Sequence, residues 1–273
     1  MQRILSAVLG LTLTVGLATG CTAQRIAAEK AVAQAIITDK QEEELGLQVK
    51  KELEQKEKIK YVEDPAVVDY VRGVSTKLLQ VANRDRKGVK WKINVIDDPK
   101  MVNAFATPGG YLYVYTGLLL AADNEAELAG VMAHEAGHVV ARHSARALVQ
   151  QYGLATVAKA ALGEDPGTVG QIAAALVGGG VQLAHGRSQE TEADEYGVRY
   201  TTAVGYDPRG LVSFFQKLKA QEGQMPGFMK WLSTHPTSAE RVDYLNQYIT
   251  KNRLAGNDLG ADRLAAIKQR IKK

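Results

Sequence analysis

The segment from Val131 to Val140 reads V-M-A-H-E-A-G-H-V-V and constrains this chain more than any other stretch. Its apolar residues favour a helix, in which His134 and His138, four residues apart, lie on one face about one turn from each other. Two imidazole groups at that spacing can bind one zinc ion. Glu135 lies about 100° around the helix from His134, so it flanks the metal without entering the coordination shell.

This arrangement has a definite chemistry. Glu135 can accept a proton from a water molecule that zinc has acidified and pass it to a leaving amine, which is the hydrolysis of a peptide bond. Asn124 with Glu127 three residues later predicts a capping box at the start of the helix. There is no proline between Ala126 and Tyr152, so we expect one long helix, in which Gly137 allows another segment to pack closely.

Size and charge narrow the class of protein. A chain of 273 residues that is 45% hydrophobic can form one sizeable globular domain with extensions. Its net charge of +4 comes from lysine and arginine residues scattered among acidic ones. A nucleic-acid binder usually has a basic stripe interleaved with aromatic residues, and this pattern is missing here. We therefore expect no nucleic-acid partner.

The N-terminus has the layout of a secretory signal. A positive start, Met1 to Arg3, is followed by the apolar stretch Ile4 to Leu17 and by small residues before Cys21, the single cysteine of the chain. The apolar stretch is short for a transmembrane helix. The layout resembles a bacterial lipoprotein signal, which implies removal of residues 1–20 and a lipid anchor at Cys21; an ordinary signal peptide or an uncleaved anchor is the alternative. Thr22, in place of an aspartate, resembles the outer-membrane class, so we expect a periplasmic protein anchored to the outer membrane.

A small sheet is expected before the histidine helix. Alternating residues predict strands over Val89–Ile96 and Tyr111–Tyr115, and we expect the sheet to be antiparallel. An exposed edge of such a sheet can bind an extended peptide by strand addition. Asn103, Ala104 and Phe105, which lie between the two strands, are our candidate substrate-binding residues in this region.

The remaining segments are mainly helical in pattern. Gly153 to Ala184 predicts two helical segments around a loop, which would form a close-packed or mobile helical lid. We divide the chain into a signal (1–20), a tether (21–37), one metallopeptidase-like domain (38–250) and an amphipathic C-terminal extension (251–273). The other expected helices are 38–60, one beginning after Pro65 and ending before Asn83, 188–202, 209–220 and 237–248.

A catalytic zinc needs three protein ligands and an open position for water. The metzincin pattern would need a glycine and a histidine where this chain has Ala141 and Ser144, so that class is excluded. His143 lies nine residues from His134, about 180° around the expected helix, so we place it outside the site as a surface or packing residue. The third ligand must therefore come from downstream.

The candidates are the acidic residues of the segment 187–195. On a helix Glu190 and Asp194 share one face while Glu192 points away. One carboxylate could bind zinc while the other accepts an N–H from a ligand histidine. Spacing alone also allows Glu192 with Glu195 on another face, or a solvated surface without a metal.

H-E-x-x-H followed by E-x-x-A-D resembles the M48 family of zinc metallopeptidases, the family of the CAAX prenyl protease and HtpX. Residues 103–119, 134–138, 187–194 and 233–241 resemble blocks of that family. The resemblance implies that Glu190 is the third zinc ligand and Asp194 a partner behind the ligands. It also implies a gluzincin-like α+β fold, mainly helical, with a small sheet beside the H-E-x-x-H helix.

The resemblance also gives roles to two later residues. His235 is expected near the metal, where it either stabilises the tetrahedral oxyanion or occupies the open coordination position as a self-inhibitory plug. Arg241 is expected to orient its loop, bind substrate or form a structural ion pair. His185 we interpret as structural. Unlike the prenyl protease and HtpX, the chain shows no transmembrane helix after its signal, which favours a compact lipoprotein-type member.

Three functions compete. The leading hypothesis is a zinc endopeptidase, with one zinc per chain, that degrades misfolded or damaged proteins of the cell envelope. The second is a latent, chaperone-like assembly factor for outer-membrane proteins, in which zinc and His235 hold the site closed. The third, a cell-wall amidase, is weaker because the sheet edge and the family blocks favour a peptide chain as substrate.

Overall fold

The computed structural model describes residues 37–178, 185–221, 231, 235 and 239–272. The predicted signal, Cys21 and nearly all of the tether lie outside these residues, and the domain boundaries likewise stay predictions. Within the described ranges, each helix is either too short or too polar to span a bilayer.

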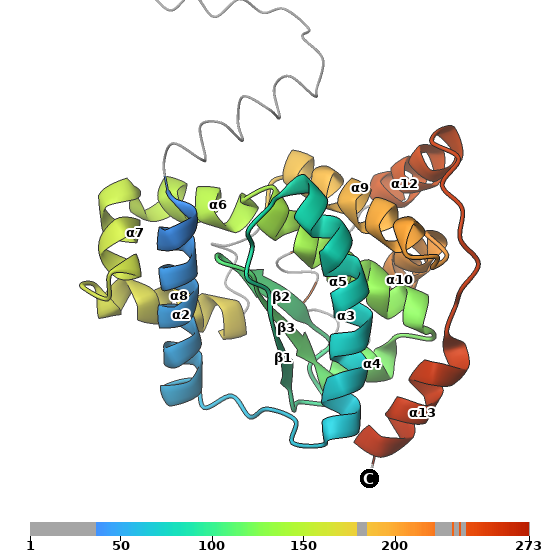
Figure 1. Ribbon diagram of the computed structural model, residues 1–273, viewed down its shortest axis with the longest axis horizontal. Helices are drawn as coiled ribbons and strands as arrows, with labels where there is room; N and C mark the ends of the chain where they lie inside the picture. The colour runs from blue at the N-terminus through green and yellow to red at the C-terminus, as the bar shows by residue number, and fades with distance from the viewer. Residues whose placement is uncertain (1–36, 179–184, 222–230, 232–234, 236–238, 273) are drawn as a thin grey trace, which may run out of the picture.

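The predicted fold class is confirmed: the described chain is mainly helical and carries one small sheet. In Figure 1 the sheet lies in the middle, with α2, α7 and α8 on the left and α10, α12 and α13 on the right. The strands are β1 (Lys92–Ile96), β2 (Ala104–Thr107) and β3 (Tyr111–Tyr115). The helices are α2 (Asp39–Gln55), α3 (Pro65–Asp85), α4 (Thr116–Ala121), α5 (Glu125–Val140), α6 (His143–Tyr152), α7 (Leu154–Ala161), α8 (Pro166–Gly178), α9 (Arg187–Ala203), α10 (Arg209–Ala220), α12 (Ala239–Lys251) and α13 (Ala261–Ile271).

The sheet is mixed, whereas we expected it to be antiparallel. Its order is β1-β3-β2, with β2 antiparallel to β3 and β1 parallel to β3. A tight turn through Gly109 and Gly110, both with positive φ, makes β2 and β3 antiparallel. Strand β3 lies between its two predecessors and runs parallel to β1. In this order β2 is an edge strand of the sheet.

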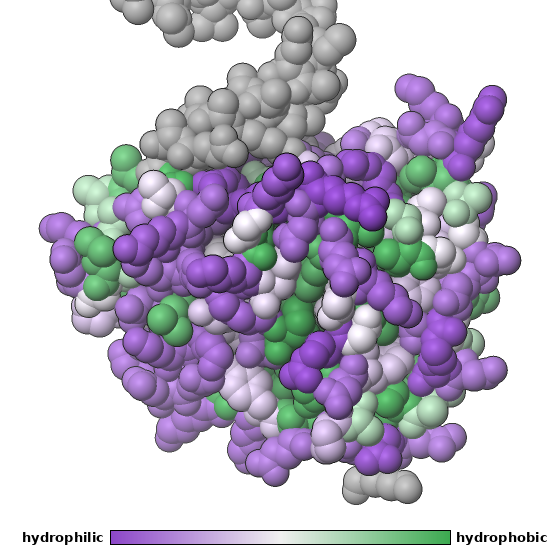
Figure 2. Space-filling model, in the orientation of Figure 1, coloured by the Kyte–Doolittle hydropathy of each residue, from purple (hydrophilic) through white to green (hydrophobic). Residues whose placement is uncertain are grey.

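Both faces of the sheet are covered. All five residues of β3 are buried. Leu112 and Val114 belong to one core cluster, with residues of α3, α5, α9 and α10, whereas Tyr111, Tyr113 and Tyr115 belong to another with residues of α2, α6, α7 and α8. The alternation along β3 thus divides the core into two layers. On the face shown in Figure 2 the surface is mostly hydrophilic, with smaller hydrophobic areas.

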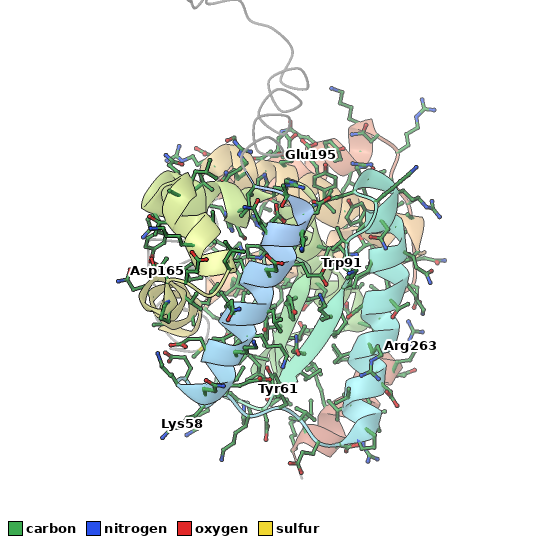
Figure 3. All side chains as sticks on the ribbon, turned by 60° about the vertical axis from the view of Figure 1, so that its left-hand side comes forward. Lys58, Tyr61, Trp91, Asp165, Glu195 and Arg263 are labelled. Carbon is green, nitrogen blue, oxygen red and sulfur yellow. The ribbon has the colours of Figure 1, made fainter. Side chains whose placement is uncertain are left out.

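The Gly/Ala-rich region forms α7 and α8, in agreement with the two predicted helical segments, and its role as a lid stays a prediction. Val169, Ile172 and Ala173 of α8 are buried in the cluster that includes α2. The Gly179-Gly180 end of the second segment lies outside the described residues. The C-terminal helix α13 docks on the start of α5, where Arg263 binds Glu125 with an Nη2–Oε1 distance of 2.7 Å (Figure 3).

Helix α5, which carries the H-E-x-x-H motif, is buried along its whole length. The predicted cap is present: the Asn124 side chain accepts a hydrogen bond from the Glu127 N–H at 3.0 Å. The Glu127 carboxylate accepts from Asp123 N–H at 2.9 Å, one residue before the position that a capping box uses.

The prediction of one long helix up to Tyr152 is wrong. Helix α5 ends at Val140, and Arg142 has a left-handed backbone with φ 59° before α6 begins. The Arg142 guanidinium donates to the Ile37 carbonyl at 2.7 Å and pairs with Glu42 at 2.9 Å. These contacts with Ile37 and with Glu42 of α2 accompany the break, so tertiary interactions outweigh local helix propensity here.

Gly137 allows α9 to approach α5, as its place between the histidines predicts. A Cβ at Gly137 would lie 2.8 Å from the Tyr196 Cβ and 3.2 Å from the Ala193 Cα. We expect Gly137→Ala to destabilise the protein by about 1–3 kcal/mol, because the backbone of α9 must shift. The control is Gly73→Ala on α3, where a Cβ meets nothing within 4 Å. Urea denaturation should show the control unchanged or stabilised, and equal effects of both changes would contradict the close-approach argument.

Candidate metal centre

Four side chains converge on one point between α5 and α9. They are His134 and His138 from α5, Glu190 from α9, and His235. Each offers one ligand atom, and these atoms all lie within 4.8 Å of one another. The four residues are buried, so a metal held by them would be shielded from solvent.

The spacing of the ligand atoms fits zinc. His134 Nε2 lies 3.0 Å from His138 Nε2 and 3.7 Å from Glu190 Oε2, and His138 Nε2 lies 3.5 Å from Glu190 Oε1. Ligands bound to zinc in a tetrahedral arrangement at about 2.0–2.1 Å are about 3.3–3.4 Å apart. Within the described residues, the buried Glu190 Oε1 accepts no hydrogen bond, which is what a ligand atom awaiting a cation would show.

Hydrogen bonds behind His134 direct its Nε2 lone pair at the metal position. His134 Nδ1 lies 2.9 Å from Asp194 Oδ1. Because a carboxylate can only accept, the proton of the ring is on Nδ1 and Nε2 is unprotonated. Burial lowers the pKa of His134 despite the Asp194 carboxylate, so the ring is neutral at neutral pH.

His138 is oriented by a second chain of contacts. Its Nδ1 lies 2.9 Å from His143 Nδ1, and His143 Nε2 lies 3.1 Å from Glu192 Oε2. The Glu192 carboxylate assigns a proton to His143 Nε2, so His143 Nδ1 accepts from His138 Nδ1–H. The Nε2 atom of His138 then carries a lone pair towards the metal position.

This contact corrects one interpretation made from the sequence. His143 is fully buried and bonds to the candidate ligand His138, whereas we expected a surface or packing histidine outside the site. Its other nitrogen contacts Glu192, which is not among the four grouped side chains. Our expectation for His143 assumed a helix that continues through residue 143, but the left-handed Arg142 turns the chain so that α6 starts beside His138. We find no signal in the sequence that would have shown this.

We expect His143→Ala to weaken zinc binding by about 10- to 100-fold, because His138 loses the acceptor that fixes its tautomer and ring orientation. Competition with a chromogenic chelator measures the affinity. His143→Gln, whose side-chain carbonyl can accept the same proton, should restore part of it. An affinity that is unchanged in His143→Ala would show that the contact is packing alone.

Arg241 of α12 binds two carboxylates of the site. Its Nε and Nη2 donate to Asp194 at 2.8 and 2.7 Å, and its Nη1 lies 2.9 Å from Glu190 Oε2. Burial acts to raise the pKa of Asp194, but Arg241 and His134 hold it below the ordinary value. Burial raises the pKa of Glu190 to about 8 against the opposing charge of Arg241. Of the roles considered for Arg241, the geometry favours the ion pair.

Glu135 sits between the metal position and the edge strand β2. The Ala106 N–H donates to its carboxylate, and His235 Nε2 lies 3.3 Å from Glu135 Oε1. Burial, together with the charge of Glu190, raises the pKa of Glu135 well above its ordinary value. Its place beside the metal position is the one that a general base needs.

Aromatic contacts fix His235 and place His185 beside the site. The His235 ring stacks on Trp231 with centroids 4.6 Å apart. The His185 ring stacks on His138 at 3.9 Å, and burial lowers the pKa of His185 to about 3. From the sequence we interpret His185 as structural only, because no spacing rule connects it to the H-E-x-x-H motif.

The candidate substrate-binding residues separate into two groups. Asn103 and Phe105 line a cavity next to Glu135, and the buried Asn103 Oδ1 accepts no hydrogen bond from the described residues. The Ala104 side chain is fully buried in the core, so only its backbone could contact a substrate. Their roles in binding stay predictions.

Comparison with known proteins agrees with this site. The model of peptidase family M48 matches residues 65–249. The mitochondrial metalloendopeptidase OMA1 of Schizosaccharomyces pombe is 34% identical over 181 residues, which cover 66% of this chain and 52% of that protein. The putative beta-barrel assembly-enhancing protease of Vibrio cholerae is 33% identical over 190 residues, which cover 66% of this chain and 39% of that protein. The beta-barrel assembly-enhancing protease of Escherichia coli is 28% identical over 193 residues, which cover 66% of this chain and 38% of that protein. The chain thus matches about half or less of the length of these relatives.

Proposed function

Because the chain belongs to peptidase family M48, a family of zinc metallopeptidases, we propose that it is a zinc-dependent endopeptidase of the bacterial cell envelope. The observation that carries this proposal is the convergence of His134, His138 and Glu190, with Glu135 beside them. We further propose that its substrates are misfolded or damaged envelope proteins and that a lipid at Cys21 anchors it to the outer membrane. The printed name of the Vibrio cholerae relative, a putative beta-barrel assembly-enhancing protease, supports an envelope role.

Different residues of the chain have different roles in the proposed hydrolysis. A bound zinc ion would be held by His134, His138 and Glu190 and would supply the Lewis acidity that activates water. Glu135 takes the proton of the attacking water and delivers it to the leaving amine. The side-chain oxygen Oδ1 of Asn103 can accept an N–H of the substrate backbone, and the edge strand β2 can align an extended peptide.

His235 supports a latent state of the same site. It supplies a fourth ligand atom where a catalytic zinc keeps an open position for water. We propose that His235 is a plug, which must withdraw before a substrate can bind. The same observation is the reason to keep the second candidate, a latent assembly factor that recognises outer-membrane proteins with little proteolysis.

Metal analysis and casein digestion test these proposals on protein that lacks residues 1–21. We expect one zinc per chain and casein cleavage. His235→Ala should cleave faster if the residue is a plug, because the fourth position is then open, and more slowly if it stabilises the oxyanion. Zinc without cleavage in either protein would favour the assembly factor, and protein without zinc would reject the metal site.

A further inference from the structure

An apolar cavity opens beside the metal centre and supports an inference beyond the proposed activity. Glu135, His185 and His235 line it, and the edge strand β2 and the turn after it form one wall. The remaining wall comes from α6 and α8, which Figure 1 shows on the same side of the sheet as α2. The wall residues from these two helices are Ser144, Ala147, Leu148, Ile172, Ala175 and Leu176.

The chemistry of the wall favours apolar occupants. The part formed by α6 and α8 offers aliphatic side chains and one hydroxyl, and Phe105 and Pro108 continue the apolar surface on the strand side. Among the described lining residues the one carboxylate is Glu135. An acidic side chain that entered would lose its hydration and face Glu135, and a basic one could pair only with Glu135, the carboxylate that the proposed reaction uses.

A second cavity on the other side of the centre has a different character. It reaches the candidate ligand Glu190 instead of Glu135, and its lining includes Arg187, Glu240 and Arg241. Such a lining suits a polar segment of a substrate, or solvent. Of these two cavities, the one beside Glu135 is therefore the one suited to selection by apolar contact.

We propose that the apolar cavity is the substrate subsite for a bulky aliphatic or aromatic side chain next to the scissile bond. This inference rests on the proposed function. The cavity shares Glu135 with the site of water activation, so a side chain that fills it belongs to a residue adjoining the bond that is cut. Envelope proteins that have lost their fold expose such side chains, whereas folded ones bury most of them. The cavity therefore selects for unfolded chains.

Two adjacent alanines on α8 allow a matched test. Ala175 lines the cavity, whereas its neighbour Ala174 is exposed outside it. Ala175→Leu adds three carbon atoms to the wall and reduces the space for a substrate. Ala174→Leu makes the same chemical change on the same helix and leaves the cavity as it is.

The probes are peptidyl hydroxamates that bind metal through the hydroxamate and differ only in the adjacent side chain: isobutyl, benzyl, methyl or carboxymethyl. Calorimetric titration of the zinc-loaded full chain in detergent measures their binding without turnover. We expect isobutyl and benzyl to bind at least ~10-fold more tightly than methyl, and carboxymethyl most weakly. In Ala175→Leu the large side chains should lose that advantage, and in Ala174→Leu they should keep it.

The outcomes separate the subsite from the proposed function. Equal affinity for all four side chains in the unmodified protein, or the same preference in Ala175→Leu, would overturn the subsite and leave the peptidase standing. If the hydroxamates bind neither the zinc-loaded protein nor its His235→Ala variant, in which the proposed plug is removed, the metal is not accessible and both proposals fail. Mapping of the bonds cut in casein adds a second readout: leucine, isoleucine and phenylalanine should recur beside them, less often with Ala175→Leu.

Discussion

Replacement of Glu135 by glutamine is expected to slow peptide hydrolysis by about 100- to 10,000-fold while zinc content stays at the level of the unmodified protein. Glutamine has the size of glutamate, and its carbonyl oxygen can still accept the Ala106 N–H. It cannot take a proton from water, so only the rate of the chemical step is reduced. His134, His138 and Glu190 keep their positions, and metal binding is preserved.

Rates on casein or a quenched peptide, with metal analysis of the same preparation, measure this effect. Glu164→Gln is the matched control, because Glu164 is exposed in the turn between α7 and α8. It should cleave at the unmodified rate. If Glu135→Gln retained a rate within ~10-fold of the unmodified protein, another group would be the base.

Replacement of Arg241 by methionine is expected to have the largest effect on stability. Arg241 contacts Asp194 and Glu190, whose side chains are 0% and 2% exposed. Removing one partner of a buried ion pair leaves uncompensated charge and costs about 3–5 kcal/mol. The loss should be greatest in the metal-free protein, because a bound zinc ion supplies positive charge beside Glu190. Zinc affinity should fall as well.

Denaturation in urea, with and without zinc, measures the free energy of unfolding, and a competing chelator measures zinc affinity. The control is Arg199→Met on α9, since Arg199 is 44% exposed and its pair with Asp85 spans 3.3 Å near the surface. Such a pair contributes about 0–1 kcal/mol. Similar losses in the two variants would mean that the Arg241 contacts add little to stability, contrary to our reading of the site.

Local pattern was enough to predict most of the secondary structure. The apolar period after Pro65 predicted α3, and the expected helix 209–220 coincides with α10. Alternation predicted β3 within its observed bounds, and Asn124 caps α5 as expected. These features depend on side-chain periodicity and on contacts within a few residues, which are written in the sequence.

The candidate site was predictable where ligands share a helix. His134 and His138 need only the geometry of one helix to lie together, and Glu190 with Asp194 likewise share a face of α9. That these two helices face each other was implied by the family resemblance. The structure brings them together through the close approach at Gly137.

The rest required tertiary structure. The sequence determined the H-E-x-x-H helix, the place of Glu135 on it and the mainly helical class, because helical spacing is a local property. Tertiary contacts decided where that helix ends: Arg142 binds α2 and turns the chain, which places His143 behind His138 and α6 along the apolar cavity. They also decided that Arg241, distant in sequence, neutralises Asp194 and Glu190. Long-range burial of charge and backbone turns fixed by distant partners depend on the whole fold, and local periodicity carries no information about either.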